Sequence, residues 1–201
     1  MTSTLGITEI IMTANICICQ GNIFEGGAHL TVLPASAKGT ISTACNTWVE
    51  LFGLKAPPFD RPPVLGGISE PLPFPKPLIS NFYCYAYSVF NDRSSEDVLI
   101  NVARALGRLT HDFPELKIVQ TPLLGTGAGG LKNEMAARAL VKGFSETARS
   151  DSMLCIFVFD AERYLSLQKV FQGPLDRFID AVDLKLTFMG SGVDFKKWLK
   201  K

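Results

Sequence analysis

Four glycines fall within the six residues from Gly125 to Gly130, between an apolar run and a helical pattern. The run from Leu116 to Leu124 predicts a buried strand, and apolar spacing from Met135 to Ala148 predicts a helix capped by Asn133. Glycine permits positive φ and lets a ligand touch bare backbone. Amides that converge at a helix N-terminus favour phosphate. We therefore expect an anion-binding loop; a tight turn without a ligand is the alternative, but it requires fewer glycines.

The spacing Gly125-x-Gly127-x-x-Gly130 also matches the dinucleotide-binding fingerprint, which is weak evidence when it stands alone. In a Rossmann unit an acidic residue follows about 20 positions later, and Asp160 comes somewhat late for this role. The fingerprint normally opens the fold, whereas here it stands late in the chain. A nucleoside triphosphate loop matches less well, because Lys132 is followed by asparagine rather than serine or threonine. A Rossmann-like NAD-binding domain stays as an alternative.

The composition is that of one globular domain spanning residues 1–201. Apolar residues make up 47% of the chain and the net charge is +1, which gives no electrostatic basis for nucleic acid as the main partner. No segment approaches ~20 uninterrupted apolar residues, so we expect no membrane span. The amino end lacks the basic start and apolar core of a secretion signal. We therefore expect a cytoplasmic protein.

The cysteines and histidines predict neither a metal site nor a disulfide framework. The five cysteines are scattered, and Cys17 and Cys19 are expected on the same face of a strand as reduced core thiols. The two histidines, His29 and His111, stand too far apart for zinc-type spacing. We expect no metal and no cofactor.

Strand and helix patterns alternate along the chain, which predicts an α/β sandwich with a mixed, mainly parallel sheet. Tyr83, Tyr85 and Tyr87 share one strand face and are expected to pack beneath a neighbouring segment, a base-stacking platform being the alternative. Thr40 or Ser42 is expected to cap the first helix, and Ser94 the second. Strands are expected at 10–19, 29–35, 81–90, 116–124 and 153–159, and helices at 41–52, 94–109, 135–148, 161–171, 175–182 and 193–199.

Two segments stand apart from this core. The insertion at 56–78 holds eight of the twelve prolines, so we expect an ordered segment without regular elements that acts either as a lid or as a structural strap. Residues 174–201 are expected to form a helical tail whose basic end is a solvated face.

Four short pieces follow one another in a familiar order: Gly21-Asn22-Ile23, the strand and loop at 32–39, the run at 122–131, and Phe159-Asp160. Together they resemble the macro domain, a three-layer α/β/α fold that binds ADP-ribose and related nucleotides. The likeness covers about residues 10–172. It is greatest to the divergent macro-like domains found beside NAD-consuming effectors in bacterial defence proteins.

The resemblance implies a role for each of these pieces. Asn22 stands where the family usually has the aspartate that accepts from the adenine amine, and the amide of Ile23 would contact the purine. Phe159 would line the adenine pocket, with a core position as the alternative. Lys38 is either a phosphate counter-charge or merely solvated. The implied ligand-binding residues are Asn22, Ile23, Ser36, Ala37, Lys38, Gly39, Thr40, Leu124, Gly125, Thr126, Gly127, Ala128, Gly129, Gly130, Leu131, Phe159 and Asp160.

The stretch from Leu124 to Leu131 is called the glycine loop below. Within it, Gly125 to Leu131 would wrap the diphosphate and the distal ribose, with residues 36–40 as the opposite wall. Hydrolytic macro domains commonly carry an Asn-Ala-Ala-Asn motif that is missing here. Another branch uses an acidic residue in the glycine loop, where this chain has Gly129.

Without an evident general base we expect a sensor of ADP-ribose or of a related, cyclic or otherwise modified, NAD-derived nucleotide, with no catalytic residue. An ADP-ribosyl hydrolase or ADP-ribose-phosphate phosphatase is the alternative. The resemblance leaves open an association or fusion with an effector domain, and a homo-oligomer.

Overall fold

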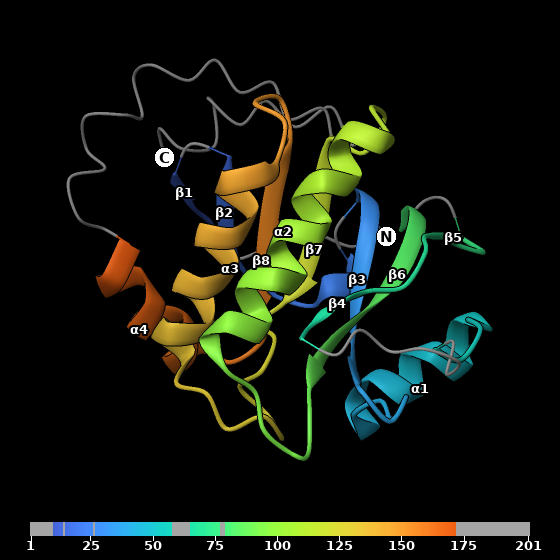
Figure 1. The fold of residues 1–201 in the computed structure, drawn as a ribbon, viewed down its shortest axis with the longest axis horizontal. Coiled ribbons are helices and arrows are strands. Elements are labelled where there is room, and N and C mark those ends of the chain that lie inside the picture. Colours follow the sequence, from blue (N-terminus) through green and yellow to red (C-terminus); the bar gives the residue numbers. More distant parts are fainter. Residues whose placement is uncertain (1–9, 14, 26, 58–64, 77–78, 172–201) are drawn as a thin grey trace, which may run out of the picture.

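The computed structural model describes residues 10–13, 15–25, 27–57, 65–76 and 79–171. Their centre is an eight-stranded sheet in the order β1-β2-β8-β7-β3-β6-β4, with β5 also paired to β6 (Figure 1). The strands are β1 (Ile10–Thr13), β2 (Ile16–Gln20), β3 (Ala28–Ser36), β4 (Gly67–Ile68), β5 (Leu72–Pro73), β6 (Ser80–Val89), β7 (Ile118–Pro122) and β8 (Met153–Val158). The helices are the 3-10 helix η1 (Ile23–Glu25), α1 (Thr43–Phe52), α2 (Glu96–Asp112), α3 (Asn133–Thr147) and α4 (Ala161–Phe171).

Five strands in the middle of the sheet, β2, β8, β7, β3 and β6, run parallel to one another. Among the strands that the structure describes, the antiparallel pairs lie toward the two ends, where β1 joins β2, and β4 and β5 join β6. All six residues of β8 are buried, as expected for a strand covered on both faces. The predicted mixed, mainly parallel sheet is therefore confirmed.

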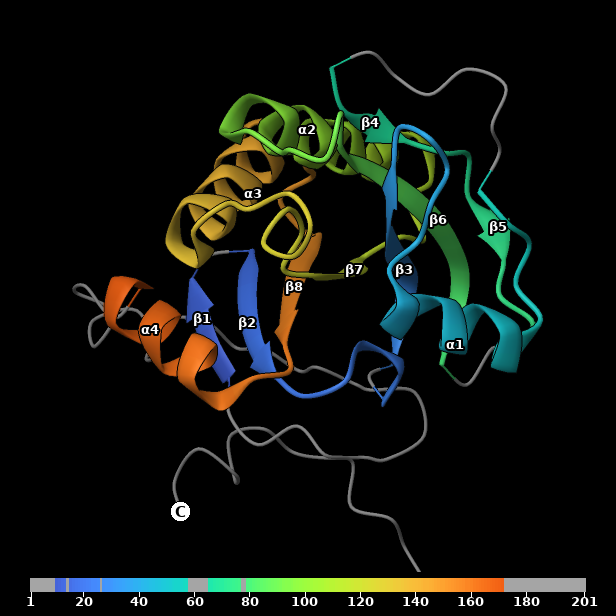
Figure 2. The ribbon, with the colours of Figure 1, turned by 90° about the horizontal axis from the view of Figure 1, so that it is seen from below.

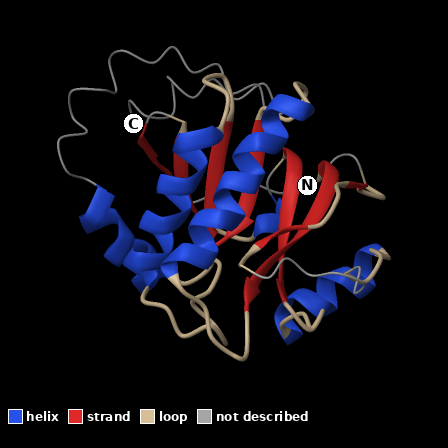
Figure 3. Ribbon diagram, in the orientation of Figure 1, coloured by secondary structure: helices blue, strands red, loops and turns tan. Residues whose placement is uncertain are grey.

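Helices cover both faces of the sheet, which gives the predicted three layers (Figures 2 and 3). On one face Leu154 and Ile156 of β8 share a core with buried residues of α2 and α3, and Ile18 of β2 packs with α4. On the other face Cys155 and Phe157 share a core with residues of η1, α1 and the tyrosine-bearing side of β6. Alternate residues of one strand thus serve two separate cores.

The start of the chain differs from the expectation of one strand over residues 10–19. The structure has a hairpin there, with Thr13 paired to Ile16 and Asn15 at φ 65° between the strands. Asparagine tolerates this left-handed conformation, which allows the chain to turn between Thr13 and Ile16 in a segment whose composition indicates only β-structure.

Helix starts follow the capping rules, with small shifts from the expected residues. Ser42 caps α1 by accepting from the Cys45 amide, which confirms one of the two predicted caps. Ser95, not the predicted Ser94, caps α2 by accepting from the Val98 amide. The cap position of α3 is Lys132, which makes no side-chain cap, so the prediction of Asn133 is wrong. The predicted helix at 161–171 is confirmed with the same bounds.

The proline-rich insertion was expected to hold no regular element, and this is wrong for two short pieces. β4 and β5 both pair with β6 and so extend the edge of the sheet. The carbonyl of Leu65 accepts from Asn101 of α2 at 2.9 Å, which ties the described part to the α2 layer and favours a strap. Residues 58–64 and 77–78, and the tail at 174–201 with its two expected helices, lie outside the described residues.

The three tyrosines of β6 are buried beneath the segment that follows α1. The Tyr83 hydroxyl accepts from the Lys55 amide at 2.9 Å, and the Tyr85 hydroxyl donates to the Lys55 carbonyl at 2.6 Å. Tyr87 is only 3% exposed. The expected packing is confirmed, and a base-stacking platform is excluded because the ring faces are covered. No helix among the described residues combines the length and apolar character that a bilayer crossing requires.

The close contact of α2 with α3 depends on Gly143. A Cβ at this position would lie 2.3 Å from the Ile100 carbonyl oxygen and 2.8 Å from Ala103 Cβ. We expect Gly143→Ala to lower the free energy of unfolding by about 1–3 kcal/mol, measured by urea denaturation, because the two helices must separate. This loss should outweigh the higher helix propensity of alanine, about 1 kcal/mol. The exposed neighbour is the control: Lys142→Ala should change stability by less than ~0.5 kcal/mol.

His29 of β3 makes the free energy of unfolding depend on pH. Its Nδ1 accepts from the Ile118 amide at 3.0 Å. Burial, and then the nearby charge of Lys117, lower the pKa of His29 below its usual value, against a smaller opposite effect of Glu115. The unfolded chain therefore takes up the proton first, and stability present above about pH 6.5 is lost as the pH falls through the folded-state pKa.

We expect urea denaturation to show a loss of stability between pH 7.5 and pH 5.5 that His29→Asn reduces, since the amide oxygen can accept the same bond without titrating. The exposed His111 is the matched control, and His111→Asn should keep the wild-type loss. An equal loss in His29→Asn and wild type would contradict this assignment.

Candidate functional site

The predicted site residues lie on loops at one edge of the sheet, where the parallel strands end. Asn22 and Ile23 follow β2, Phe159 and Asp160 follow β8, the glycine loop follows β7, and residues 36–40 end β3 and follow it. The Gly21 amide donates to the Val158 carbonyl at 3.1 Å, and the Leu123 amide donates to the Phe157 carbonyl at 3.2 Å. Figure 2 looks onto this edge. The parallel topology thus brings four separated pieces of sequence together.

The connections that leave β3 and β7 diverge. These strands are neighbours in the sheet, with Thr31 paired to Gln120. From β3 the chain passes to α1 on one face, and from β7 it passes to α3 on the opposite face (Figure 2). In open α/β sheets ligands bind in the crevice that forms at such a point, beyond the carboxyl ends of the strands. The loop at 36–40 and the glycine loop flank this point.

The glycine loop presents six consecutive amides, from Leu124 to Gly129, that donate to no other described residue. The next two amides are used within the loop: Gly130 donates to the Gly127 carbonyl at 3.1 Å, and Leu131 to the Gly125 carbonyl at 3.0 Å. Leu124, Gly125 and Gly129 are buried. Because buried backbone amides are nearly always paired, this run calls for an acceptor supplied by water or by a ligand.

Three positions of the glycine loop hold glycine for different physical reasons. Gly125 has φ 76°, which disfavours other residues. A Cβ on Gly129 would lie 2.6 Å from the Gly125 carbonyl oxygen, so a close approach within the loop excludes a side chain. Gly127 is exposed, and a Cβ there would meet nothing within 4 Å. Packing within the protein therefore does not require glycine at 127, and the residue leaves room next to the free amides.

Ser94, in the loop before α2, belongs to the same site and was not among the predicted residues. Its amide donates to the Gly129 carbonyl at 3.0 Å. Its hydroxyl is buried without a hydrogen-bond partner among the described residues and would lie 2.9 Å from a Cβ on Gly125. The sequence pattern favoured a helix cap at this serine, and only the contact with the glycine loop reveals its other role.

The opposite loop, residues 36–40, is built differently. Each of its five amides is already used: Ser36 donates to Thr40, Ala37 to Val89, Gly39 to Ser36, and both Lys38 and Thr40 donate to the Ser36 hydroxyl. The hydroxyls of Ser36 and Thr40 lie 2.6 Å apart. This loop therefore offers a ligand its side chains, chiefly the exposed Lys38, rather than its backbone amides.

Asn22 forms a local turn at the end of β2. Its Oδ1 accepts from the Phe24 amide at 3.0 Å, which orients the side-chain amide and leaves Nδ2 as its donor. The Ile23 amide donates to none of the described residues. Both groups can therefore contact a base edge, with a donor from each residue and the remaining lone pair of Oδ1 as an acceptor.

The two residues after β8 have separate positions. Phe159 is 84% exposed, so the alternative of a core residue is excluded. An exposed ring at this edge provides a flat surface for a base or sugar. The Asp160 carboxylate accepts from the Arg163 amide at 2.9 Å and so caps α4. This helix cap gives the carboxylate a structural role.

A hollow of about 330 Å³ lies elsewhere, at the C-terminal end of α2, and is lined in part by Ile68, Arg108 and His111. It is distant in the fold from the glycine loop, because α2 begins at the loop and ends at the other edge of the sheet (Figure 1). The glycine loop is therefore identified as the candidate site by its backbone donors and not by a cavity.

No model of a known protein family and no curated protein matches this sequence. Several solved structures are similar. The macrodomain of Mycobacterium tuberculosis DarG is 14% identical with a TM-score of 0.57, over 72% of this chain and 98% of that one. The Trypanosoma brucei macrodomain in complex with ADP-ribose is 15% identical with a TM-score of 0.60, over 78% of this chain and 68% of that one.

Thermosipho africanus DarTG in complex with ADP-ribose is 12% identical with a TM-score of 0.59, over 82% of this chain and 48% of that one. The match thus spans about half the length of DarTG. These similarities show that the chain has the macrodomain fold, which confirms the fold that the resemblance implied.

Proposed function

We propose that this protein binds ADP-ribose or a related NAD-derived nucleotide and acts as a recognition module. The observation that carries the proposal is the run of six amides from Leu124 to Gly129, which have no partner in the part of the chain that the structure describes and lie at the carboxyl end of β7 and before α3. A diphosphate supplies several acceptor oxygens and negative charge, which the helix N-terminus favours. A ligand without acceptor atoms would leave these donors unsatisfied.

The comparisons support this proposal at the level of the fold. Two of the similar structures, those of the T. brucei macrodomain and of T. africanus DarTG, contain ADP-ribose. In the present chain the unpaired amides lie at the strand edge where open α/β sheets bind ligands. We infer that the diphosphate contacts the glycine loop and that Lys38 provides a counter-charge from the opposite side.

The residues of the remaining loops have the chemistry to contact the base and the sugars of the nucleotide. Asn22 and the Ile23 amide offer polar contacts to a base edge, and the exposed ring of Phe159 offers a stacking surface. The Ser94 hydroxyl beside the glycine loop offers one further donor. Ser36 and Thr40 would face the ligand through their side chains, because their amides are occupied.

We infer binding without turnover as the primary function. Asp160 is the one carboxylate among the proposed ligand-binding residues, and it caps α4. A carboxylate engaged in this way is poorly placed to activate water. An assay with an ADP-ribosylated protein and with ADP-ribose phosphate tests the hydrolase and phosphatase alternatives: release of product that Lys38→Ala or Asp160→Asn abolishes would favour an enzyme.

Cytoplasmic location and association with an effector domain are part of the same proposal. All five cysteines are free thiols, and reduced thiols are typical of the cytoplasm. A module that recognises an NAD product is suited to work with the enzyme that makes or removes it, in the same chain or in a partner. Size-exclusion chromatography with light scattering would establish whether the module self-associates.

Gly127 provides a direct test of the diphosphate contact. We expect Gly127→Leu to weaken ADP-ribose binding by at least about 100-fold, or ~2.7 kcal/mol, because the side chain would fill the space in front of the amides. The free energy of unfolding should change by less than ~0.5 kcal/mol, since a Cβ there meets no neighbour. Isothermal titration calorimetry and urea denaturation measure the two quantities.

The matched control is Ser145→Leu, an exposed position at the far end of α3, which should bind as the wild type does. AMP, which lacks the diphosphate, should bind more weakly than ADP-ribose. The absence of saturable heat with ADP-ribose, cyclic ADP-ribose variants and NAD would contradict the proposed function. Tight binding of NADH without any preference for ADP-ribose would favour a Rossmann-like NAD-binding domain.

Asn22 tests the base contact. The Asn22 side chain can donate through Nδ2 as well as accept, whereas aspartate can only accept. We therefore expect Asn22→Asp to raise the preference for ADP-ribose over its hypoxanthine analogue by about 5- to 30-fold, in line with ~1–2 kcal/mol for one changed hydrogen bond. Competition calorimetry with the two nucleotides measures this ratio. An unchanged ratio would place the base away from Asn22.

A further inference from the structure

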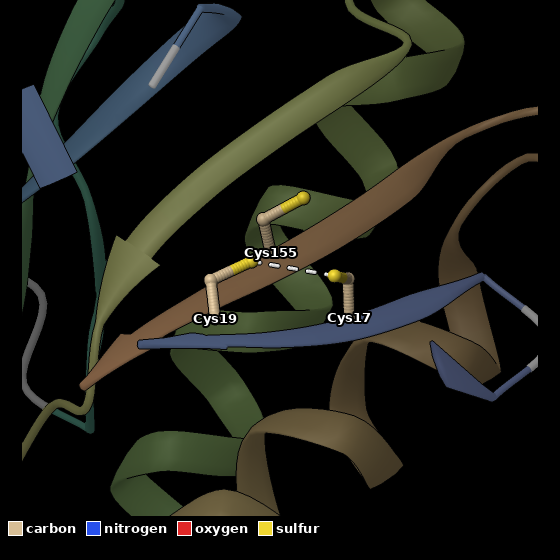
Figure 4. A group of neighbouring side chains, drawn as sticks. All are labelled: Cys17, Cys19 and Cys155. Atoms are coloured by element: carbon tan, nitrogen blue, oxygen red, sulfur yellow. Dashed lines mark hydrogen bonds between the residues drawn. The ribbon is translucent and has the colours of Figure 1, made fainter. Parts of the chain in front are cut away.

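Three buried cysteines converge on the face of the sheet opposite α2 and α3 (Figure 4). Cys17 and Cys19 alternate along β2, and Cys155 of β8 is paired in register with Cys17. The sulfurs of Cys17 and Cys19 lie 3.3 Å apart, and all three sulfurs lie within 4.8 Å of one another. The residues are 2%, 3% and 7% exposed. We call Cys17, Cys19 and Cys155 the thiol cluster.

Strand pairing fixes the backbone positions of the thiol cluster. Its three residues occupy central positions of two parallel strands that are hydrogen-bonded to each other from Ile16 to Gln20. On the other side of β8, Cys155 is paired in register with Gln120 of β7. The Gln120 side chain donates to the Ile23 carbonyl and to the Thr31 hydroxyl. Because the backbone holds all three Cα positions, the sulfurs can close on a bound ion through small side-chain rotations.

The donor set points to one class of ion. All three ligand atoms are sulfur, which selects soft metals such as Cu(I) over Mg²⁺, Ca²⁺ or Mn²⁺. Structural zinc sites take four ligands in a tetrahedron. Among the described residues only three histidine, cysteine or acidic ligand atoms gather here. Cu(I) is satisfied by three sulfurs and needs neither a fourth protein ligand nor a water in a buried, apolar position.

We propose that Cys17, Cys19 and Cys155 form a three-coordinate binding site for Cu(I). Each ligating thiol releases its proton to solvent, and the metal stays in the Cu(I) state throughout. A disulfide between Cys17 and Cys19 would use only two of the sulfurs, whereas the arrangement directs three to a common point. The bound ion would join β2 to β8, the two strands whose following loops carry Asn22 and Phe159.

The test uses the full chain, purified anaerobically and titrated with Cu(I) against a chromophoric Cu(I) chelator. We expect one tightly held Cu(I) per chain and a melting temperature raised by several degrees, because a ligand that binds only the folded state stabilises it. X-ray absorption at the copper edge should show three sulfur neighbours. This count of sulfurs requires no variant and so does not depend on how a variant folds.

Cys155→Ser should lower the affinity for Cu(I) by at least about 100-fold, and Cys84→Ser should leave it unchanged. Cys84 is a matched control because it is equally buried but belongs to the core on the α2 and α3 face. Four results would overturn the proposal: no retained Cu(I), equal retention in Cys155→Ser, tighter binding of Zn²⁺ with a fourth ligand, or purification of the chain with a Cys17–Cys19 disulfide. ADP-ribose binding, measured separately, does not enter this test.

Discussion

Parallel pairing of five strands is the constraint on which the rest of this structure depends. Because β2, β8, β7, β3 and β6 run in one direction, every loop that follows them emerges at the same edge. The crossovers from β3 and β7 then pass to opposite faces, and the two loops separate. A parallel strand pair also requires a long crossover, which is why helices fill both outer layers.

The two loops beside this crevice use the backbone in opposite ways. In residues 36–40 every amide is already paired, four of them within the loop and that of Ala37 with the Val89 carbonyl, so the loop forms a compact wall. Within the described ranges, the glycine loop pairs its last two amides and leaves the preceding six without a partner, so its donors are available to an acceptor from outside. In the proposed arrangement an anion would have backbone partners on one side and the Lys38 side chain on the other. This asymmetry is the physical basis of the proposed diphosphate orientation.

Periodicity and composition were sufficient to predict most of the secondary structure, because strand and helix patterns depend on residues close together in the sequence. The helix at 161–171 and the strand at β8 follow directly from their apolar spacing. The predictions that were wrong failed for other reasons. A left-handed Asn15 lies at the turn where the first segment forms a hairpin, and the α2 cap falls at Ser95 rather than Ser94. The short β4 and β5 exist because β6 offers them an edge, which their own sequence does not show.

The sequence by itself determined the α/β layering and the glycine loop, since both rest on residue types at fixed short spacings. It also indicated that Cys17 and Cys19 share a face, because side chains on a strand alternate. Only the tertiary structure brought Cys155 beside them and Ser94 beside Gly129, and only the structure showed that Oδ1 of Asn22 is engaged by the Phe24 amide. Contacts between residues distant in the chain depend on strand order and register, which no local pattern encodes.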